Sequence, residues 1–414
     1  MSRLEELIQQ YCPDGVERKT LRELGSFYGG LSGKAKEDFK GGNAKFISYK
    51  NIYSNPSLNI NTDEKVKIAE GEKQHTIQYG DVLFTGSSET PDECGLSSVL
   101  TDHTDEKLYL NSFCFGFRLN DASLFLPGFL KHLFRSGELR LQIGKTASGT
   151  TRFNVSKKRF ATVSIPVPPL PVQEEIVRIL DNFTELQAEL QAELQKRLQQ
   201  NNYYRDNLLS FEGRTDVQWK KLGDVADLLS GFPFDSSLFA DNGIKLMRGV
   251  NIKRGQLCFN KTDDRYWESE KGLEKYIVNE NDIVISMDGS LVGRSFGMVK
   301  KEHLPLLLVQ RVARIRSSSA NINYIYYCIC NWFPDYVDKK KTQGAIPHIS
   351  LKDIANFPIP FPSLLEQQKM VEILNHFDTL TNDLTSGLPA EIEKRRQQYE
   401  YYRDKLLTFK RKEA

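Results

Sequence analysis

The chain has 414 residues, with 56 basic and 54 acidic side chains, and its net charge of +2 indicates no particular class of partner. This length suggests two or three domains. No apolar run is long enough to span a membrane, and the charged N-terminus MSRLEELIQQ predicts an amphipathic helix rather than a signal peptide, so we expect a cytoplasmic protein. Six cysteines without a Cys-x-x-Cys pair favour neither a disulfide framework nor a zinc site.

The chain is a tandem duplication of a unit of about 200 residues. The best-matched segments are VERKTLRELG (16–25) with VQWKKLGDVA (217–226), GDVLFT (80–85) with NDIVIS (281–286), and YYRDNLLSF (203–211) with YYRDKLLTF (401–409). Each unit begins with a globular part and ends with a long helix. The sequences of the helical ends match closely, whereas the globular parts share only a few short matching segments.

Each globular part predicts a mixture of helices and strands. Short β-rich runs such as QYGDVLFTG (78–86) and YIVNENDIVISM (276–287) are separated by turn residues, and helix-like segments follow at 125–144 and 322–340. The fold class is therefore α+β. Proline-rich segments from Ser164 and Phe357 can be neither helix nor central strand, and we expect them to be stiff linkers that direct each long helix away from its domain.

Apolar residues on both long helices recur at steps of 3 and 4, which is a heptad pattern that needs a partner helix. The two heptad seams are Ile176, Ile179, Phe183, Leu186 and Leu190 on the first helix and Met370, Ile373, Phe377, Leu380 and Leu384 on the second. Two such helices most simply pack on each other. Gly387 and Pro389 interrupt the second helix, which predicts two segments with Pro389 in the first turn of the later one.

Motifs for catalysis are weak in this sequence. Gly144-Lys145-Thr146 ends like a phosphate-binding loop, but Leu139 stands where that loop needs glycine, and a turn is the better interpretation. The acidic residues between Pro334 and Lys340 are too crowded for a nuclease triad, and the histidines show no metal-ligand spacing. We expect a binding protein with no catalytic residue and no metal.

Basic residues cluster beside aromatic ones in both units. The run from Arg140 to Phe160 contains six basic residues and no acidic one, and a second basic run extends from Arg294 to Arg316. Such clusters are the electrostatic footprint of nucleic-acid binding, although a solvated charged surface is an equally ordinary origin for any one of them. Two non-identical domains joined by a long helix favour the reading of two separated sites on one duplex.

The duplicated plan and four segments resemble the specificity subunit of type I restriction-modification systems over essentially the whole chain. The segments are CPDGVERKTLRELG (12–25), SGFPFDSSLF (230–239), TQGAIPHISLKDIANFPIPFPSLLEQQ (342–368) and LPAEIEKRRQQYEYYRDKLLTF (388–409). The resemblance implies two target-recognition domains, 1–164 and 214–357, each reading half of a bipartite asymmetric DNA site. It also implies that the helical regions 165–213 and 358–414 form an antiparallel coiled coil that spaces the domains.

The resemblance further implies that this chain is not catalytic and holds no cofactor. Two modification subunits would dock on the helical regions and bring S-adenosylmethionine, and restriction subunits would add chemistry that needs ATP and magnesium. Direct readout of bases uses Arg, Lys, Asn and Gln side chains in the major groove. The DNA-binding candidates are Lys34, Lys36, Lys50, Arg152, Lys157 and Lys158 in the first domain and Arg248, Lys253, Arg254, Arg294, Lys341 and Gln343 in the second.

Three tandem tetrads in the first long helix, ELQA (185–188), ELQA (189–192) and ELQK (193–196), suggest a ruler. Each tetrad adds about 6 Å of helix, which corresponds to one or two base pairs of DNA, and in similar family members such repeats act in this way. An ordinary helix rich in good helix formers is the alternative. For the whole chain, the alternatives are a coiled-coil scaffold that presents two peptide-binding domains, and a self-sufficient nuclease or methyltransferase.

Overall fold

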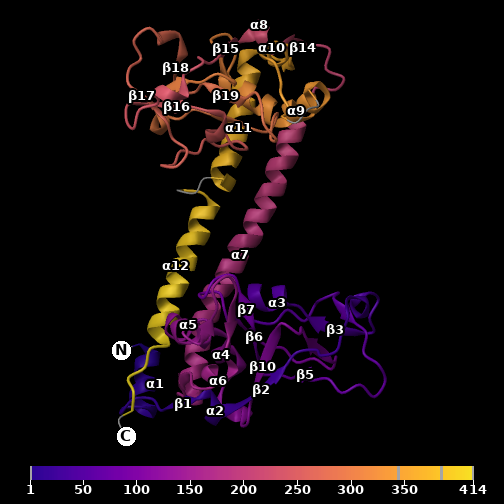
Figure 1. Cartoon of the computed structure of the whole chain (residues 1–414), viewed down its shortest axis with the longest axis vertical. Helices are drawn as coiled ribbons and strands as arrows, with labels where there is room; N and C mark the ends of the chain where they lie inside the picture. Colours follow the sequence, from indigo (N-terminus) through magenta and orange to yellow (C-terminus); the bar gives the residue numbers. More distant parts are fainter. Residues whose placement is uncertain (1, 343–345, 383–385, 413–414) are drawn as a thin grey trace. The chain divides into compact units, whose positions relative to one another are not determined.

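A computed structural model describes residues 2–342, 346–382 and 386–412 and divides the chain into two compact units. Unit 1 comprises residues 1–192 and 390–414, and unit 2 comprises residues 193–389. Two helices, α7 (Leu170–Leu208) and α12 (Leu388–Leu406), cross the boundary between the units (Figure 1). Among the described helices, none is long and apolar enough to cross a membrane.

Besides α7 and α12, the elements of unit 1 are α1 (Arg3–Tyr11), β1 (Arg18–Thr20), α2 (Leu21–Leu24), β2 (Gly25–Gly29), η1 (Lys36–Phe39), β3 (Ala44–Ile47), α3 (Tyr49–Ser54), β4 (Lys65–Val66), β5 (Thr76–Ile77), β6 (Val82–Thr85), β7 (Ser87–Ser88), β8 (Ser97–Val99), β9 (Leu108–Leu110), β10 (Cys114–Leu119), η2 (Ala122–Leu124), α4 (Pro127–Leu133), α5 (Gly137–Gly144), β11 (Ala147–Ser148), β12 (Phe153–Val155), α6 (Lys157–Phe160) and β13 (Ser164–Pro166).

The elements of unit 2 are β14 (Gln218–Lys221), α8 (Leu222–Val225), β15 (Asp227–Ser230), η3 (Ser236–Leu238), β16 (Ile244–Met247), η4 (Gly249–Asn251), β17 (Tyr266–Trp267), η5 (Glu274–Tyr276), β18 (Ile277–Val278), β19 (Ile283–Ser286), β20 (Phe296–Met298), η6 (Lys301–His303), β21 (Leu306–Leu308), β22 (Val312–Arg316), α9 (Ile322–Lys340), α10 (Leu351–Ala355), β23 (Pro358–Phe361) and α11 (Leu364–Asn382).

The two four-stranded sheets of each unit have the same strand order, which confirms the duplication, although unit 1 also has a three-stranded sheet β11-β12-β7. Unit 1 has four-stranded sheets of order β2-β10-β6-β8 and β4-β3-β9-β5, and unit 2 has the equivalent orders β15-β22-β19-β20 and β17-β16-β21-β18. In both units one pair in the second sheet is parallel, β3 with β9 and β16 with β21, while the other pairs are antiparallel. The α+β class expected from the sequence is therefore confirmed.

The matched segments GDVLFT and NDIVIS form the strands β6 and β19, which separate two cores. Val82 and Phe84 point to the core built with α4 and α5, whereas Leu83 points to the second sheet. Ile283 and Ile285 repeat this alternation in unit 2. Successive side chains of a strand point to opposite faces, so a strand with apolar residues at every position is buried on both sides.

A buried aspartate directly precedes each of these strands and pairs with an arginine on the neighbouring strand. Asp81 is 1% exposed and accepts from Nε and an Nη of Arg118 at 2.8 and 2.6 Å. Asp282 is also 1% exposed and accepts the same two bonds from Arg316, both at 2.7 Å. Bidentate pairs of this kind fix the geometry of both partners. These arginines therefore serve the scaffold.

The proline-rich segments are strands, which corrects the expectation of linkers directed away from the domains. β13 pairs with β1, and β23 pairs with β14, each as a two-stranded antiparallel sheet. Proline is tolerated there because a two-stranded sheet has only edge strands. The helices that follow pack onto the same domains, because Ile176 and Leu180 of α7 are buried in the unit 1 core and Val371 and Leu374 of α11 are buried in the unit 2 core.

The second long helix is divided as expected. α11 ends at Asn382 and α12 begins at Leu388, so Pro389 lies in the first turn of the later segment. Proline fits there because the first N–H groups of a helix have no partner inside the helix. The predicted N-terminal helix is confirmed as α1, whose Leu4 is buried.

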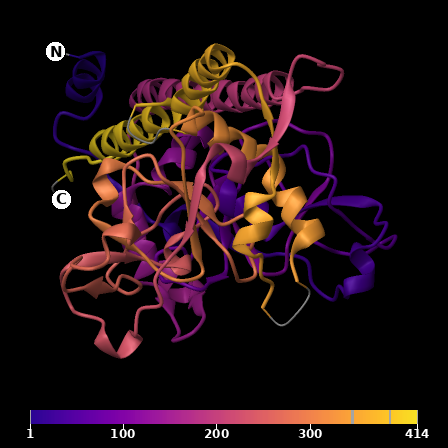
Figure 2. The same ribbon diagram turned by 90° about the horizontal axis from the view of Figure 1, so that it is seen from above.

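Each half of α7 packs beside one of the later helices inside its own unit (Figures 1 and 2). In unit 1 the ring of Phe183 stacks on that of Tyr402 in α12. In unit 2 the ring of Tyr204 stacks on that of Phe377 in α11, and Asn201 donates to Asp378 and Thr381. The earlier residue of α7, Asn201, contacts the later residues of α11, and the later residue of α7, Tyr204, contacts the earlier residue Phe377. The two helices are therefore antiparallel.

Among the described residues, the members of the two predicted heptad seams are buried to different degrees. Ile176 is buried against its own domain, and Met370 packs against the core of unit 2. Leu186 and Ile373 are 37% and 41% exposed. The remaining described members Ile179, Phe183, Leu190, Phe377 and Leu380 are partly buried, and Leu384 lies outside the described residues. Each helix must cover its own domain as well as a neighbouring helix, so its apolar residues are divided between two contacts.

Candidate nucleic-acid interface

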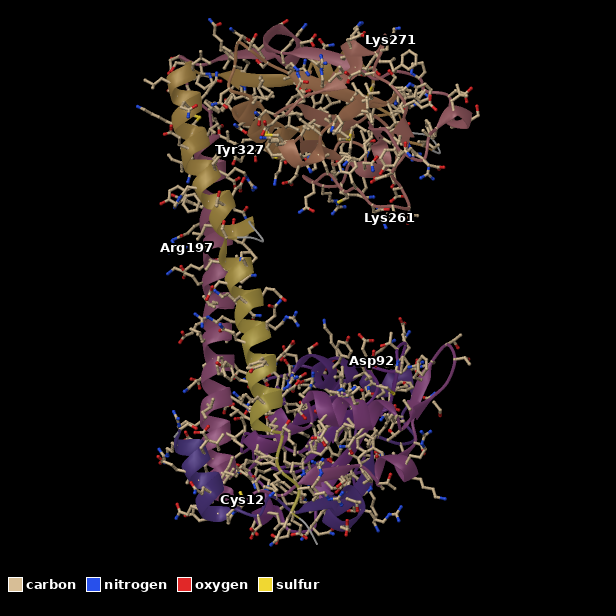
Figure 3. The ribbon with its side chains drawn as sticks, turned by 90° about the vertical axis from the view of Figure 1, so that its left-hand side faces the viewer. Cys12, Asp92, Arg197, Lys261, Lys271 and Tyr327 are labelled. Atoms are coloured by element: carbon tan, nitrogen blue, oxygen red, sulfur yellow. The ribbon has the colours of Figure 1, made fainter. Side chains whose placement is uncertain are left out.

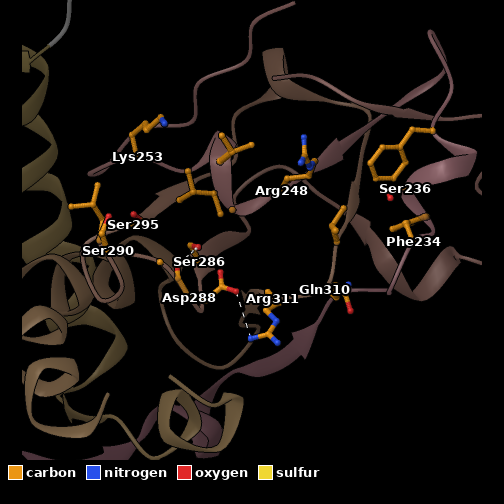
Figure 4. Close-up of a pocket in the computed structure, with 17 residues that line it drawn as sticks. Phe234, Ser236, Arg248, Lys253, Ser286, Asp288, Ser290, Ser295, Gln310 and Arg311 are labelled. Atoms are coloured by element: carbon orange, nitrogen blue, oxygen red, sulfur yellow. Dashed lines mark hydrogen bonds and ion pairs between the residues drawn. The ribbon is translucent and has the colours of Figure 1, made fainter. Parts of the chain in front are cut away.

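Two of the candidates in the second domain line an open cleft of about 570 Å³ (Figure 4). They are Arg248 and Lys253, and across the cleft lie Asp288 and Arg311. Hydroxyl and amide groups complete the polar lining, contributed by Ser236, Ser286, Ser290, Ser295 and Gln310. A concave surface with cationic, hydroxyl and amide groups offers the donors and acceptors that contact base edges and phosphates.

A buried asparagine shapes the wall that carries Arg248. Asn251 is fully buried, and its Oδ1 accepts from the backbone N of Arg248 at 3.2 Å while its amide donates to Cys258 O. Arg248 also donates to Asp263 O at 3.0 Å, and its guanidinium lies 5.9 Å from the ring centre of Phe239. These contacts hold Arg248 at the cleft rather than in free solvent.

Of the four further candidates in this domain, two contact one carboxylate, one is exposed and one lies outside the described residues. Arg294 and Lys341 both contact Asp338, at 2.8 and 2.7 Å, and their hydrogen bonds hold the pKa of that carboxyl well below its usual range. Arg254 is exposed. Gln343 lies outside the described residues. The acidic stretch near Pro334 is thus part of α9, with Asp338 engaged in ion pairs.

In the first domain, the candidates differ in whether another protein group contacts their charged end. Lys34 is mostly buried and pairs with Glu72 at 2.6 Å, and this bond contributes most to lowering the pKa of Glu72 to about 2. Arg152 donates to Ser87 Oγ at 3.3 Å, and the ammonium of Lys157 lies 5.4 Å from the ring centre of Phe115. The remaining candidates are exposed, namely Lys36, Lys50 and Lys158.

Some residues of the two basic runs are structural. Arg140 donates to the carbonyl oxygens of Asp92, Cys94 and Gly95, all within 2.6–2.7 Å, and thereby fixes the loop that carries Asp92 to the surface (Figure 3). Arg314 is almost fully buried and pairs with Asp227. A guanidinium presents several donors in a rigid fork, so it can satisfy several backbone acceptors at once. The sequence could not separate these structural arginines from the exposed ones.

The segment that resembles the end of a phosphate-binding loop forms part of the scaffold. The hydroxyl of Thr146 is buried and donates to Ile143 O at 2.7 Å, so the segment after Gly144 is a turn and offers no hydroxyl to a phosphate. Within the described ranges, no three His, Cys, Asp or Glu side chains gather as a metal site. The six cysteines are free thiols.

Two residues of the cleft that the sequence did not single out are Asp288 and Arg311. An Nη of Arg311 lies 3.6 Å from Oδ2 of Asp288, and the two side chains are 59% and 30% exposed. Arg311 belongs to the second basic run, but nothing in that run marks it as different from Arg314 or Arg316. Asp288 follows the buried strand β19. A polar residue just after a buried strand is the sequence feature from which this site residue could have been predicted.

Polar bridges connect each domain to its helices. In unit 1 the buried His132 bonds Asp181 of α7 at 2.7 Å and Tyr399 of α12 at 2.9 Å. In unit 2 the hydroxyl of Tyr327 in α9 lies 2.8 Å from Asn375 Oδ1 and 2.8 Å from Asp378 Oδ2 of α11, within hydrogen-bond distance of both (Figure 3). Such bridges fix the angle at which each helix leaves its domain, because both ends of every bond are held.

Comparison with known proteins places this arrangement in a family. The model of the type I restriction modification DNA specificity domain matches twice, at residues 13–200 and 215–394. The chain belongs to this family. The specificity subunit of the type I restriction enzymes EcoR124I and EcoR124II of Escherichia coli is 39% identical over 275 residues, which is 63% of this chain and 66% of that protein.

Other members of the type I specificity family show the same relationship. A putative type I restriction enzyme specificity subunit of Haemophilus influenzae is 33% identical over 278 residues, covering 63% of this chain and 68% of that protein. The matches to these two curated relatives thus span about two thirds of their length.

Solved structures show the same fold over nearly the whole chain. The type I restriction-modification S subunit from M. genitalium has a TM-score of 0.56 at 15% identity, covering 94% of this chain and 96% of that one. A chain from a structural study of complex assembly and conformational transition in the type I restriction-modification system has a TM-score of 0.61 at 18% identity, covering 95% and 97%.

Proposed function

We propose that this chain is the DNA-specificity subunit of a type I restriction-modification complex. One observation carries the proposal: a single chain contains two copies of a pair of four-stranded sheets with the same strand order, while the loops between the strands differ in sequence. Two equal scaffolds with different loops suit the recognition of two different half-sites on one DNA duplex. Family membership supports the same conclusion.

Each domain would read one half of a bipartite asymmetric site, with 1–164 and 214–357 as the two target-recognition domains. Phosphate contacts from exposed basic residues would set affinity and register, and contacts to base edges would set the sequence. The helical regions 165–213 and 358–414 would set the spacing between the half-sites.

Two modification subunits would dock on the helices, and restriction subunits could join them. The duplication supports two equal docking sites, because Tyr203 and Tyr401 occupy equivalent positions and are 65% and 62% exposed. Both project beside a tyrosine held by stacking, Tyr204 and Tyr402 respectively. Large exposed aromatic side chains are typical anchors of protein interfaces.

The chemistry would belong to the partners. S-adenosylmethionine would bind the modification subunits, and ATP and magnesium the restriction subunits, while this chain would supply recognition without a catalytic step. The complex would act in the cytoplasm, and the free thiols suit such a reducing compartment.

The experiment that tests this proposal is motif mapping by single-molecule sequencing of DNA from cells that express the chain with its modification subunit. A methylated motif made of two half-sites with a fixed gap is the expected result. A complex that assembles but leaves DNA unmethylated, with a modification subunit shown to be active beside another specificity chain, would contradict it. Salt-insensitive, weak DNA binding would then favour a protein-binding scaffold.

A further inference from the structure

One short connection leads from the second sheet to the first in each unit, and both copies make equivalent backbone hydrogen bonds to the scaffold. It runs from β9 to β10 through residues 111–113 and from β21 to β22 through residues 309–311. The equivalent backbone bonds are Asn111 N to Ile47 O (3.0 Å) with Val309 N to Met247 O (3.2 Å), and Gly86 N to Phe113 O (2.9 Å) with Met287 N to Arg311 O (2.9 Å).

Glycine packs against this connection in both units. A Cβ added to Gly30 would lie 2.0 Å from Asn111 O, and a Cβ added to Gly231 would lie 2.3 Å from Val309 O. Backbone approaches this close exclude any other residue. The connection is therefore held at a fixed position on the scaffold, and its last residue is held with it.

The last residue of the connection has a different, exposed side chain in each unit. Phe113 is 63% exposed in unit 1, and Arg311 is 59% exposed in unit 2. A large apolar ring in solvent gains nothing for the fold, and Arg311 adopts a positive φ of 67°, which is uncommon for a residue other than glycine. Phe113 does not share this positive φ, so the two connections are equivalent in position and in backbone hydrogen bonding but not in every backbone angle. An equivalent position with a different exposed side chain is what a specificity-determining position requires.

Asp288 orients the guanidinium of Arg311, and the N–H donors of this group remain available to a ligand. Oδ2 of Asp288 lies 3.6 Å from one Nη, and within the described residues Arg311 donates no side-chain hydrogen bond to another group (Figure 4). By contrast, Arg314 and Arg316 on the strand that follows are bound to Asp227 and Asp282. Arg311 is thus the arginine of this strand and connection whose donors face the cleft.

We propose that Arg311, positioned by Asp288, reads a guanine in the half-site that unit 2 binds, an inference that rests on the proposed function. Arginine donates two parallel hydrogen bonds to N7 and O6 of guanine in the major groove, and no other base offers this pair of acceptors. A carboxylate beside the guanidinium limits its rotation, so less conformational entropy is lost on binding. Phe113 at the same position of unit 1 offers an apolar contact, which suits a thymine methyl group.

The test uses the wild-type complex with its modification subunit and duplexes that carry its mapped motif. Each guanine of the unit 2 half-site is replaced in turn by 7-deazaguanine, which lacks the N7 acceptor. We expect one position where this replacement weakens binding by about tenfold. Arg311→Ala is expected to bind normal and 7-deaza duplexes equally at that position, and Lys301→Ala, an exposed basic residue outside the cleft, is the matched control.

Motif mapping of the same variants supplies the second readout. Arg311→Ala should relax one position of one half-site, Asp288→Asn should relax it less, and the half-site read by unit 1 should stay unchanged as an internal control. Wild-type binding that is insensitive to 7-deazaguanine at every position overturns the inference, and so does equal sensitivity in Arg311→Ala. A wild-type complex that methylates no bipartite motif would instead contradict the proposed function.

Discussion

The ring of Phe183 stacks on the ring of Tyr402 with centroids 5.3 Å apart and planes inclined by 22°. The duplication creates the same contact a second time, between Phe377 and Tyr204, at 5.0 Å and 22°. Each stack lies inside one unit and joins the first long helix to one segment of the second. The sequence repeat therefore pairs each phenylalanine with the tyrosine of the other copy.

We expect the Phe183–Tyr402 stack to contribute a measurable coupling energy to unit 1. Aromatic pairs of this geometry contribute about 0.5–1.5 kcal/mol beyond the area they bury. A double-mutant cycle with Phe183→Leu and Tyr402→Leu, followed by chemical unfolding, measures the term directly. Leu186→Ala on the exposed side of the same helix should change the free energy of unfolding by less than about 0.5 kcal/mol. A coupling energy near zero would show that the stack is incidental.

Asp81→Asn should destabilise unit 1 by about 2 kcal/mol or more. The carboxylate is buried and accepts from Arg118, from Tyr28 at 2.7 Å and from the backbone N of Gln78 at 2.8 Å, and an amide cannot accept all of these bonds. Removing one partner of a buried pair leaves the other without compensation. Asp102→Asn, at an exposed position, is the control. Equal unfolding curves for both variants would argue against a structural role for Asp81.

The stability of unit 1 should fall as the pH falls below the ordinary pKa of histidine. Burial is the main cause that lowers the pKa of His132 below 6.5, so the unfolded chain binds this proton more readily than the folded chain. The free energy of unfolding then decreases as the pH falls from 6.5 towards the folded pKa, by at most about 1.4 kcal/mol per pH unit. His132→Gln should flatten this dependence in unfolding experiments at pH 7 and 5.5. An unchanged pH dependence would mean that His132 does not titrate in this range.

Deletion of the tetrad 189–192 should shorten the gap between the two half-sites by one or two base pairs. The four residues are helical and contribute about 6 Å of rise, against about 3.4 Å for each base pair. Both half-sites should remain as in the wild type, which motif mapping measures in the same experiment. The double substitution Glu189→Ala and Gln191→Ala keeps the helix length and should keep the gap. A gap that stays constant after the deletion would refute the ruler.

Much of the scaffold could be predicted from local patterns. The β-rich runs that contain GDVLFT and NDIVIS predicted a strand in each unit, and Pro389 marked where the later helix begins. These predictions succeeded because alternation of side chains and the missing N–H of proline act over a few residues. The strands that begin at Ser164 and Pro358 were missed because each pairs with a strand far away in the sequence, and no local signal records that partner.

The sequence by itself determined that the chain contains two copies of one unit, that each copy joins a globular domain to a long helix, and that catalytic motifs are weak. Only the tertiary structure decided which charges remain free at the cleft. The scaffold binds the guanidinium groups of three arginines, Arg140, Arg314 and Arg316. Arg311 is oriented by Asp288, and its N–H donors remain available to a ligand. The sequence cannot show this difference, because the acceptors that bind an arginine side chain come from strands that are distant in the sequence.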